Sequence, residues 1–140
     1  MHECFVRIPH RGVAVKVALD RVLNLTLWTL QGLLAAVFFY SGAGKLNQHA
    51  GFWFELFGKI GIGQWLRYFT GSLEVVCAVL LLIPRTSAIA AVMLALTMVG
   101  AVATHLLILR DGYAAFFPAS SLVALIAVAW KRRRLRSRKS

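Results

Sequence analysis

Long uncharged stretches, separated by short charged segments, dominate the pattern of this sequence. Three of them, residues 22–44, 86–109 and 112–130, contain no Asp, Glu, Lys or Arg, and each is bounded on both sides by such a residue. A helix needs about twenty residues to cross the hydrocarbon core of a bilayer. All three stretches therefore predict membrane-spanning helices.

A fourth stretch, residues 64–84, carries Arg67 and Glu74, but its second half is continuously apolar. Pro84 closes it, because proline lacks the backbone N–H that a helix interior needs. We count this stretch as a fourth span. The pattern predicts an all-α fold, an integral membrane bundle of four helices.

The segment between the first two expected spans, residues 46–63, is rich in aromatic residues. At helical spacing, Trp53, Leu56, Phe57 and Ile60 share one face. Such an amphipathic stretch favours a short interfacial helix along the outer membrane surface, with its rings at headgroup level. A docking surface for a partner protein is the alternative.

The composition agrees with a membrane protein. Of the 140 residues, 59% are hydrophobic and 15% are charged, and the mean hydropathy is +0.72. Soluble domains are near half apolar and a quarter charged. The chain is too apolar for a disordered protein and has too few cysteines for a disulfide scaffold, and its length allows one compact domain.

The net charge of +11 raises the question of nucleic-acid binding. Seven of the sixteen Lys and Arg lie in the last ten residues, directly after the span 112–130. A basic cluster beside a span marks the cytoplasmic side and attracts anionic lipid headgroups. We therefore favour contact with lipid and expect no nucleic-acid partner.

The distribution of basic residues also predicts the orientation. With four spans, twelve Lys and Arg fall on the side of the two termini and of Arg85, and four fall on the opposite side. The positive-inside rule then places both termini in the cytoplasm. The expected organisation is a basic N-terminal tail, 1–21, a four-helix transmembrane domain, 22–130, and a basic C-terminal tail, 131–140.

The two cysteines, Cys4 and Cys77, are far apart in the sequence and form no CxxC motif. A dithiol active site or a cysteine metal site needs closely spaced thiols. We interpret Cys77 as a small buried apolar residue and expect no metal site.

Ionisable residues inside the expected spans are the first candidates for function, because each costs about 2.5–3.5 kcal/mol on insertion. Glu74 falls near the midplane, where a short side chain cannot reach water. Arg67 lies two turns earlier on the same face, about 10 Å nearer the outside. Its long side chain can close part of that distance.

Further polar residues fall in the outer half of the other spans. If they face inward, they form with Glu74 a polar site open to the outer leaflet, in which Glu74 and His105 are the candidate catalytic residues. The structural alternative is that Glu74 fixes the helix register, protonated or paired with a lysine, and that the basic residues reach the headgroups. The candidate ligand-binding residues are Tyr40, Lys45, Arg67, Glu74, His105, Ser120 and Ser121.

Three other features predict details of helix packing. Gln31, deep in the first span, is expected to form a hydrogen bond between helices. Pro118 is expected to kink the fourth span and to free a backbone carbonyl. Small residues along 86–109, among them Ala91 and Ala95, predict close packing of that helix at the centre of the bundle.

Several short motifs occur together in this chain. The first span ends in YSGAGKL at residues 40–46, GSLE follows at residues 71–74, and Pro-Arg at residues 84–85 precedes a span rich in small residues. With the aromatic outer segment, this pattern resembles the DoxX family and its MauE-like relatives over about residues 25–130. The family motif carries over to Gly42, Lys45, Gly71 and Glu74.

The resemblance implies a small bacterial inner-membrane protein associated with redox chemistry. We therefore expect an accessory subunit or assembly factor of a membrane redox complex, with a protein partner or a second copy of itself. The alternative is a quinone-binding subunit in which Glu74 or His105 exchanges protons and Lys45 or Arg67 holds an oxygen. The sequence contains no cysteine cluster motif, no nucleotide-binding glycine motif and no paired haem histidines, so we do not expect a catalyst that acts alone. A small oligomeric transporter is a third hypothesis.

Overall fold

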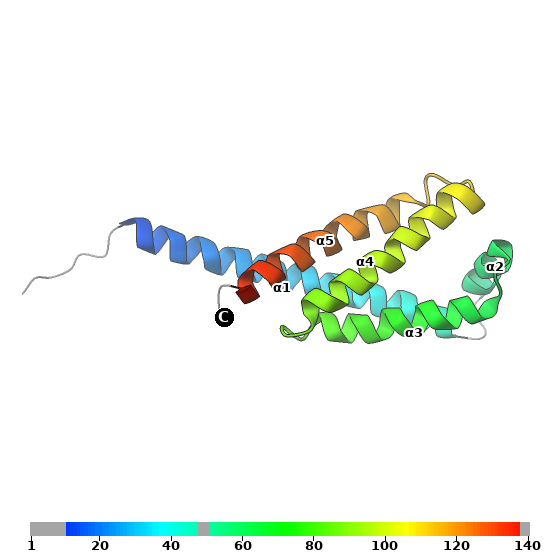
Figure 1. Cartoon of the computed structure of the whole chain (residues 1–140), viewed down its shortest axis with the longest axis horizontal. Coiled ribbons are helices and arrows are strands. Elements are labelled where there is room, and N and C mark those ends of the chain that lie inside the picture. The colour runs from blue at the N-terminus through cyan, green and yellow to red at the C-terminus, as the bar shows by residue number, and fades with distance from the viewer. Residues whose placement is uncertain (1–10, 48–50, 138–140) are drawn as a thin grey trace, which may run out of the picture.

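The computed structural model of the protein describes residues 11–47 and 51–137, and all its elements are helical (Figure 1). This confirms the all-α prediction for the described part of the chain. The π-helical turn η1 continues α4. The elements are α1 (Arg11–Leu46), α2 (Gly51–Ile60), α3 (Gln64–Leu81), α4 (Ser87–Ala103), η1 (Thr104–Ile108) and α5 (Phe116–Ser137).

The four longer helices pack as two antiparallel pairs, α1 with α3 and α4 with α5 (Figure 1). Helix α3 also contacts α4, and α1 contacts α5, so the two pairs lie against each other. We call the end at residues 82–86 the turn end and the opposite end, where α2 packs on α3 and α1, the α2 end. From the turn end the two pairs diverge toward the α2 end (Figure 1).

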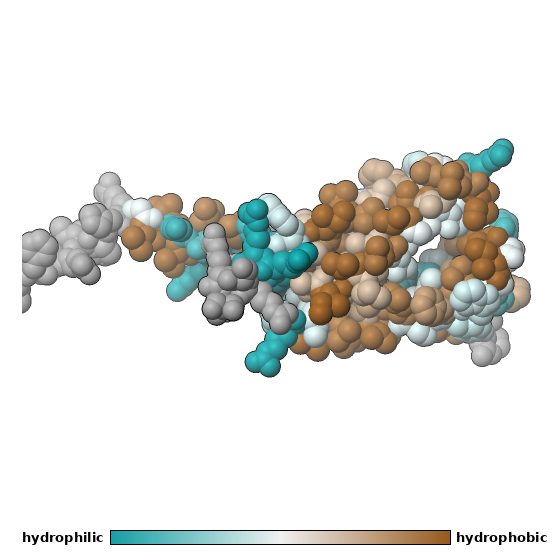
Figure 2. Space-filling view, in the orientation of Figure 1, coloured by the Kyte–Doolittle hydropathy of each residue, from teal (hydrophilic) through white to brown (hydrophobic). Residues whose placement is uncertain are grey.

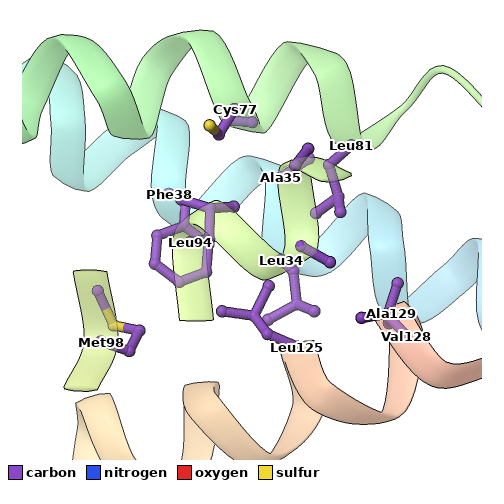
Figure 3. Close-up of a cluster of buried hydrophobic side chains, with 13 residues drawn as sticks. Leu34, Ala35, Phe38, Cys77, Leu81, Leu94, Met98, Leu125, Val128 and Ala129 are labelled. Atoms are coloured by element: carbon purple, nitrogen blue, oxygen red, sulfur yellow. The ribbon is translucent and has the colours of Figure 1, made fainter. Parts of the chain in front are cut away.

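A contiguous hydrophobic core joins all four longer helices (Figure 3). Phe38 from α1, Cys77 from α3 and Leu94 from α4 are each at most 5% exposed. Cys77 is thus a buried apolar residue, as its surroundings in the sequence predicted. The core is made of Leu34, Ala35, Phe38, Cys77, Ala78, Leu81, Ala90, Ala91, Leu94, Met98, Leu125, Val128 and Ala129.

The outer surface of the helices is also strongly apolar (Figure 2). Large side chains such as Leu33, Ile89 and Val123 are each at least 62% exposed. Soluble monomers rarely expose continuous apolar patches beyond a few hundred Å². Among the described residues, the helices Gly12–Leu46 and Ser87–Ile108 are long and apolar enough to cross a membrane.

Both ends of the helical region extend into the expected basic tails. Helix α1 begins at Arg11, before the predicted start at residue 22, and its 36 residues make it about 54 Å long. Helix α5 continues through the basic run to Ser137. No proline interrupts residues 11–21 or 131–137, so nothing in these sequences ends the helices at the predicted span limits. Residues 1–10 and 138–140 of the two tails lie outside the described residues.

The predicted kink at Pro118 is wrong. Helix α5 begins at Phe116, so Pro118 is its third residue. Within the first turn a backbone N–H has no partner inside the helix, and proline is tolerated there because nothing is lost. The backbone after it continues regularly, with the Ala119 N–H donating to the Ala115 carbonyl at 3.1 Å.

Candidate functional site

A buried ion pair joins α1 to α3 near the α2 end. The Lys45 ammonium donates to both carboxylate oxygens of Glu74, at 2.6 Å to Oε2 and 2.8 Å to Oε1. It also donates to the Ser41 hydroxyl at 2.9 Å, one turn earlier on α1. Glu74 is 1% exposed and Lys45 is 7% exposed. The three N–H groups of the ammonium therefore all have acceptors within this cluster.

Helix α2 covers this pair with an aromatic ring. The Lys45 Nζ lies 4.4 Å from the centre of the Trp53 ring, within cation–π range. Gly44 permits the close approach of that ring, because a Cβ at this position would lie 2.7 Å from Trp53 Nε1. Gly61 and Gly63, with φ of 78° and 101°, form the turn that folds α2 back against α3.

Two glycines let the backbones of α1 and α3 approach at the level of the ion pair. A Cβ on Gly42 would lie 2.7 Å from the Gly71 carbonyl oxygen, and a Cβ on Gly71 would lie 3.0 Å from the Gly42 carbonyl oxygen and 2.9 Å from Lys45 Cβ. Small residues allow helices to pack this closely. The motif residues Gly42, Lys45, Gly71 and Glu74 thus form one contact: two glycines bring the helices together, and the ion pair joins them.

Arg67 is fully buried but binds the end of α1 rather than Glu74. Its Nη1 donates to the carbonyl oxygens of Lys45 at 2.7 Å and Asn47 at 3.0 Å, and its Nε donates to Gln64 Oε1 at 2.8 Å. A cation at the last carbonyls of a helix compensates their unsatisfied partial charge. The hydrogen-bonded partner of the Glu74 carboxylate is therefore Lys45, while Arg67 binds the last carbonyls of α1.

The remaining predicted site residues do not join the pair. Tyr40 is 84% exposed on α1, and Ser120 is exposed and donates to the Phe117 carbonyl at 2.9 Å. Ser121 is 7% exposed on α5. His105 lies on η1, and its buried Nδ1 has no hydrogen-bond partner among the described residues. The polar site thus comes from α1, α2 and α3 and not from all four spans.

Three residues of the cluster were missed at the sequence level, namely Ser41, Trp53 as a partner of Lys45, and Gln64. Ser41 lies four positions before Lys45, a spacing that places both on one helical face, so it could have been found. Gln64 lies three positions before Arg67 on the same helix, so it too could have been found. Trp53 reaches the cluster only through the fold of α2 against α1 and α3, which no local spacing reveals.

Among the described residues, no three His, Cys, Asp or Glu side chains group together as a metal site requires.

The sequence model of the DoxX-like family matches residues 29–129. The chain belongs to the DoxX-like family. The match includes all four motif residues at the crossing of α1 and α3. No curated protein and no solved structure matches the chain significantly.

This DoxX-like protein has a second buried polar cluster near the turn end. Gln31 is 0% exposed, and its Nε2 donates to the Leu81 carbonyl at 2.9 Å, which confirms its predicted role between helices. Its Oε1 accepts from Nε of Arg132 at 2.8 Å and also from Nη2. Arg132 lies over the Trp28 ring, 4.9 Å from its centre. Burial lowers the pKa of Arg132, which stays protonated because arginine titrates far above neutral pH.

The Lys45 ammonium offers no open N–H group to a quinone. A quinone oxygen would need an N–H or O–H group, and the Lys45 ammonium already uses all three N–H groups on Glu74 and Ser41. Arg67 uses Nη1 and Nε on Lys45, Asn47 and Gln64. In this DoxX-like protein the arrangement therefore fits a structural ion pair better than a quinone head.

Proposed function

We propose that this DoxX-like protein is a four-helix transmembrane protein of the bacterial inner membrane, with both termini in the cytoplasm and α2 at the outer surface. Its basic residues gather toward the termini, as the positive-inside rule requires. Tryptophans mark the two expected interfaces, with Trp28 and Trp130 near the turn end and Trp53 and Trp65 near the α2 end. Along α1, Trp28 and Lys45 are about 26 Å apart, close to the thickness of a hydrocarbon core.

We further propose that the protein acts as an accessory subunit or assembly factor of a membrane redox complex. The observation that carries this proposal is the closed Lys45–Glu74 pair, whose ammonium N–H groups all bind within the chain. A catalytic residue has to contact a substrate, whereas a saturated buried pair holds α1, α2 and α3 in one arrangement. Such a rigid helix unit suits docking to a partner. The redox association comes from the family resemblance.

A direct role in quinone chemistry is the competing function. If Lys45 or Glu74 bound the quinone, the Lys45–Glu74 pair would have to open, which leaves two charges in an apolar environment at a cost of several kcal/mol. The contacts of the pair therefore favour the accessory role.

The test is gentle detergent purification of the wild type, Glu74→Gln and the control Glu55→Gln, because Glu55 is exposed on α2. Mass spectrometry would identify every copurifying protein and lipophilic molecule. We expect a stoichiometric partner that carries a redox cofactor, retained by the wild type and by Glu55→Gln, and no quinone in any of the three forms. A quinone that the wild type and Glu55→Gln retain and Glu74→Gln loses would overturn the accessory role.

A further inference from the structure

Helix α5 carries three consecutive arginines at the turn end, and the structure directs them to different sides of the helix. Arg132 lies one turn after the fully buried Val128, and its Nε donates to Gln31 at 2.8 Å. Arg133 and Arg134 are exposed. Arg132 therefore takes part in the packing of the helices, whereas Arg133 and Arg134 face the surroundings of the protein.

The two exposed arginines continue the apolar outer face of α5. Val123, Ile126 and Trp130 are each at least 54% exposed, and their spacing of three and four residues places them on one face of the helix. Arg133 and Arg134 follow Trp130 at the same spacing. The Arg134 Cζ lies 3.9 Å from the centre of the Trp130 ring, which holds this side chain on that face. Figure 2 shows the apolar surface of the helices ending in hydrophilic residues toward the turn end.

The proposed membrane placement puts these arginines at the height of the lipid headgroups. Trp130 marks the cytoplasmic edge of the hydrocarbon core. At 1.5 Å per residue, Arg133 and Arg134 lie about 5–6 Å beyond it along the axis of α5, and the headgroup layer on each side of a bilayer is about 5–8 Å thick. The apolar face below Trp130 lies beside the acyl chains of the same leaflet.

We propose that this outer face of α5 binds an anionic phospholipid of the cytoplasmic leaflet. The lipid phosphate accepts hydrogen bonds from the guanidinium groups of Arg133 and Arg134, and one acyl chain runs along Ile126 and Val123. The inference rests on the proposed membrane placement. It does not depend on the accessory role.

The chemistry of the two side chains fits a phosphate. A guanidinium presents five N–H donors in a planar fork that matches two phosphate oxygens. The contact of Arg134 with Trp130 is an attraction between its charge and the ring face, so its N–H groups can still donate to a phosphate. Two neighbouring forks on one face can bind the same phosphate group.

The surroundings of the arginines favour a lipid with a net negative charge. Residues 112–140, which include all of α5, contain no Asp or Glu. The amine or choline of a zwitterionic lipid would therefore meet cations without a nearby acidic side chain on this helix, whereas an anionic lipid brings no such group. A nucleic acid shares the phosphate but has no acyl chain to cover the exposed Val123 and Ile126.

The experiment is photocrosslinking of the full-length protein in nanodiscs of phosphatidylcholine that contain a small fraction of a lipid with a diazirine in its acyl chain. The probe is phosphatidylglycerol in one sample and phosphatidylcholine in the other, and mass spectrometry locates the adducts. We expect adducts on α5 between Val123 and Trp130, about tenfold more abundant with phosphatidylglycerol, as two cations near the membrane surface imply. Arg133→Ala/Arg134→Ala should remove this preference.

The matched control is Lys16→Ala/Lys59→Ala, which removes the same two positive charges at exposed positions of α1 and α2. It should keep the preference of the wild type. Equal labelling of α5 by the two probes, or an unchanged preference in the arginine variant, would overturn the proposal. An RNA oligonucleotide in excess should leave the labelling unchanged, and its loss would assign the arginines to nucleic acid instead.

Failure of this inference can be separated from failure of the proposed function. A cytoplasmic reporter signal at residue 140 together with equal labelling by the two probes would refute the lipid site and leave the membrane placement intact. A periplasmic signal at residue 140 would refute the placement, and with it the assignment of the lipid to the cytoplasmic leaflet.

Discussion

Lys45 and Glu74 are 29 positions apart in the sequence, yet their charged groups meet at 2.6 Å inside the protein. Removing two charges from water costs several kcal/mol each, and their attraction offsets this only when the geometry is good and the remaining hydrogen bonds are satisfied. Ser41 supplies the third acceptor of the ammonium, and Trp53 covers it. The pair therefore determines which faces of α1 and α3 meet.

Removing one partner of this pair should be strongly destabilising. Lys45→Met leaves the Glu74 carboxylate buried without its cation, and we expect a loss of about 3–5 kcal/mol in the free energy of unfolding. Unfolding of the purified protein in detergent, followed by helical circular dichroism, measures this.

The double variant Lys45→Met/Glu74→Leu is the matched control. It removes both charges and replaces them with apolar side chains, so it should recover most of the lost stability. If the single variant were as stable as the wild type, the pair would not hold α1 against α3.

Gly71→Ala should open the crossing of α1 and α3. The added methyl group would lie 2.9 Å from Lys45 Cβ and 3.0 Å from the Gly42 carbonyl oxygen, so backbone has to move. We expect a loss of about 1–3 kcal/mol, typical of overpacking. Gly100→Ala is the control, because a Cβ there meets nothing within 4 Å and alanine favours a helix. Equal stability of the two variants would contradict the close crossing.

Gln31→Leu should loosen the turn end. The change leaves the Leu81 carbonyl and the Arg132 guanidinium without their partner, at a cost of about 1–3 kcal/mol. The same unfolding measurement applies. Arg133→Ala, at an exposed position beside Arg132, should change the stability by about 0.5 kcal/mol or less. If Gln31→Leu were as stable to unfolding as Arg133→Ala, the hydrogen bonds of the Gln31 side-chain amide would not stabilise the turn end.

Reporter fusions test the orientation. A fusion at residue 140 should report the cytoplasm, and one at Ile62, between α2 and α3, should report the periplasm. Removing positive charge from the C-terminal run should weaken this preference, because basic residues near the span ends set it. Both fusions reporting the same side would contradict the three spans expected between them and the placement of α2 opposite the termini.

The sequence by itself predicted most of the helical layout. The predicted spans 64–84 and 86–109 correspond to α3 and to α4 with η1, and the aromatic segment contains α2. Such patterns are readable because hydrophobicity and helix periodicity are local properties of the chain. The motif residues at the crossing of α1 and α3 were also found in the sequence.

Only the tertiary structure decided which polar groups meet. Glu74 has Lys45 as its partner rather than Arg67, because the close approach at Gly42 and Gly71 brings Lys45 beside it, while Arg67 lies at the last carbonyls of α1. Tyr40, in the same helix as Lys45, faces outward. Partners of this kind depend on the rotation and separation of helices distant in sequence, and a hydropathy pattern along one helix contains neither.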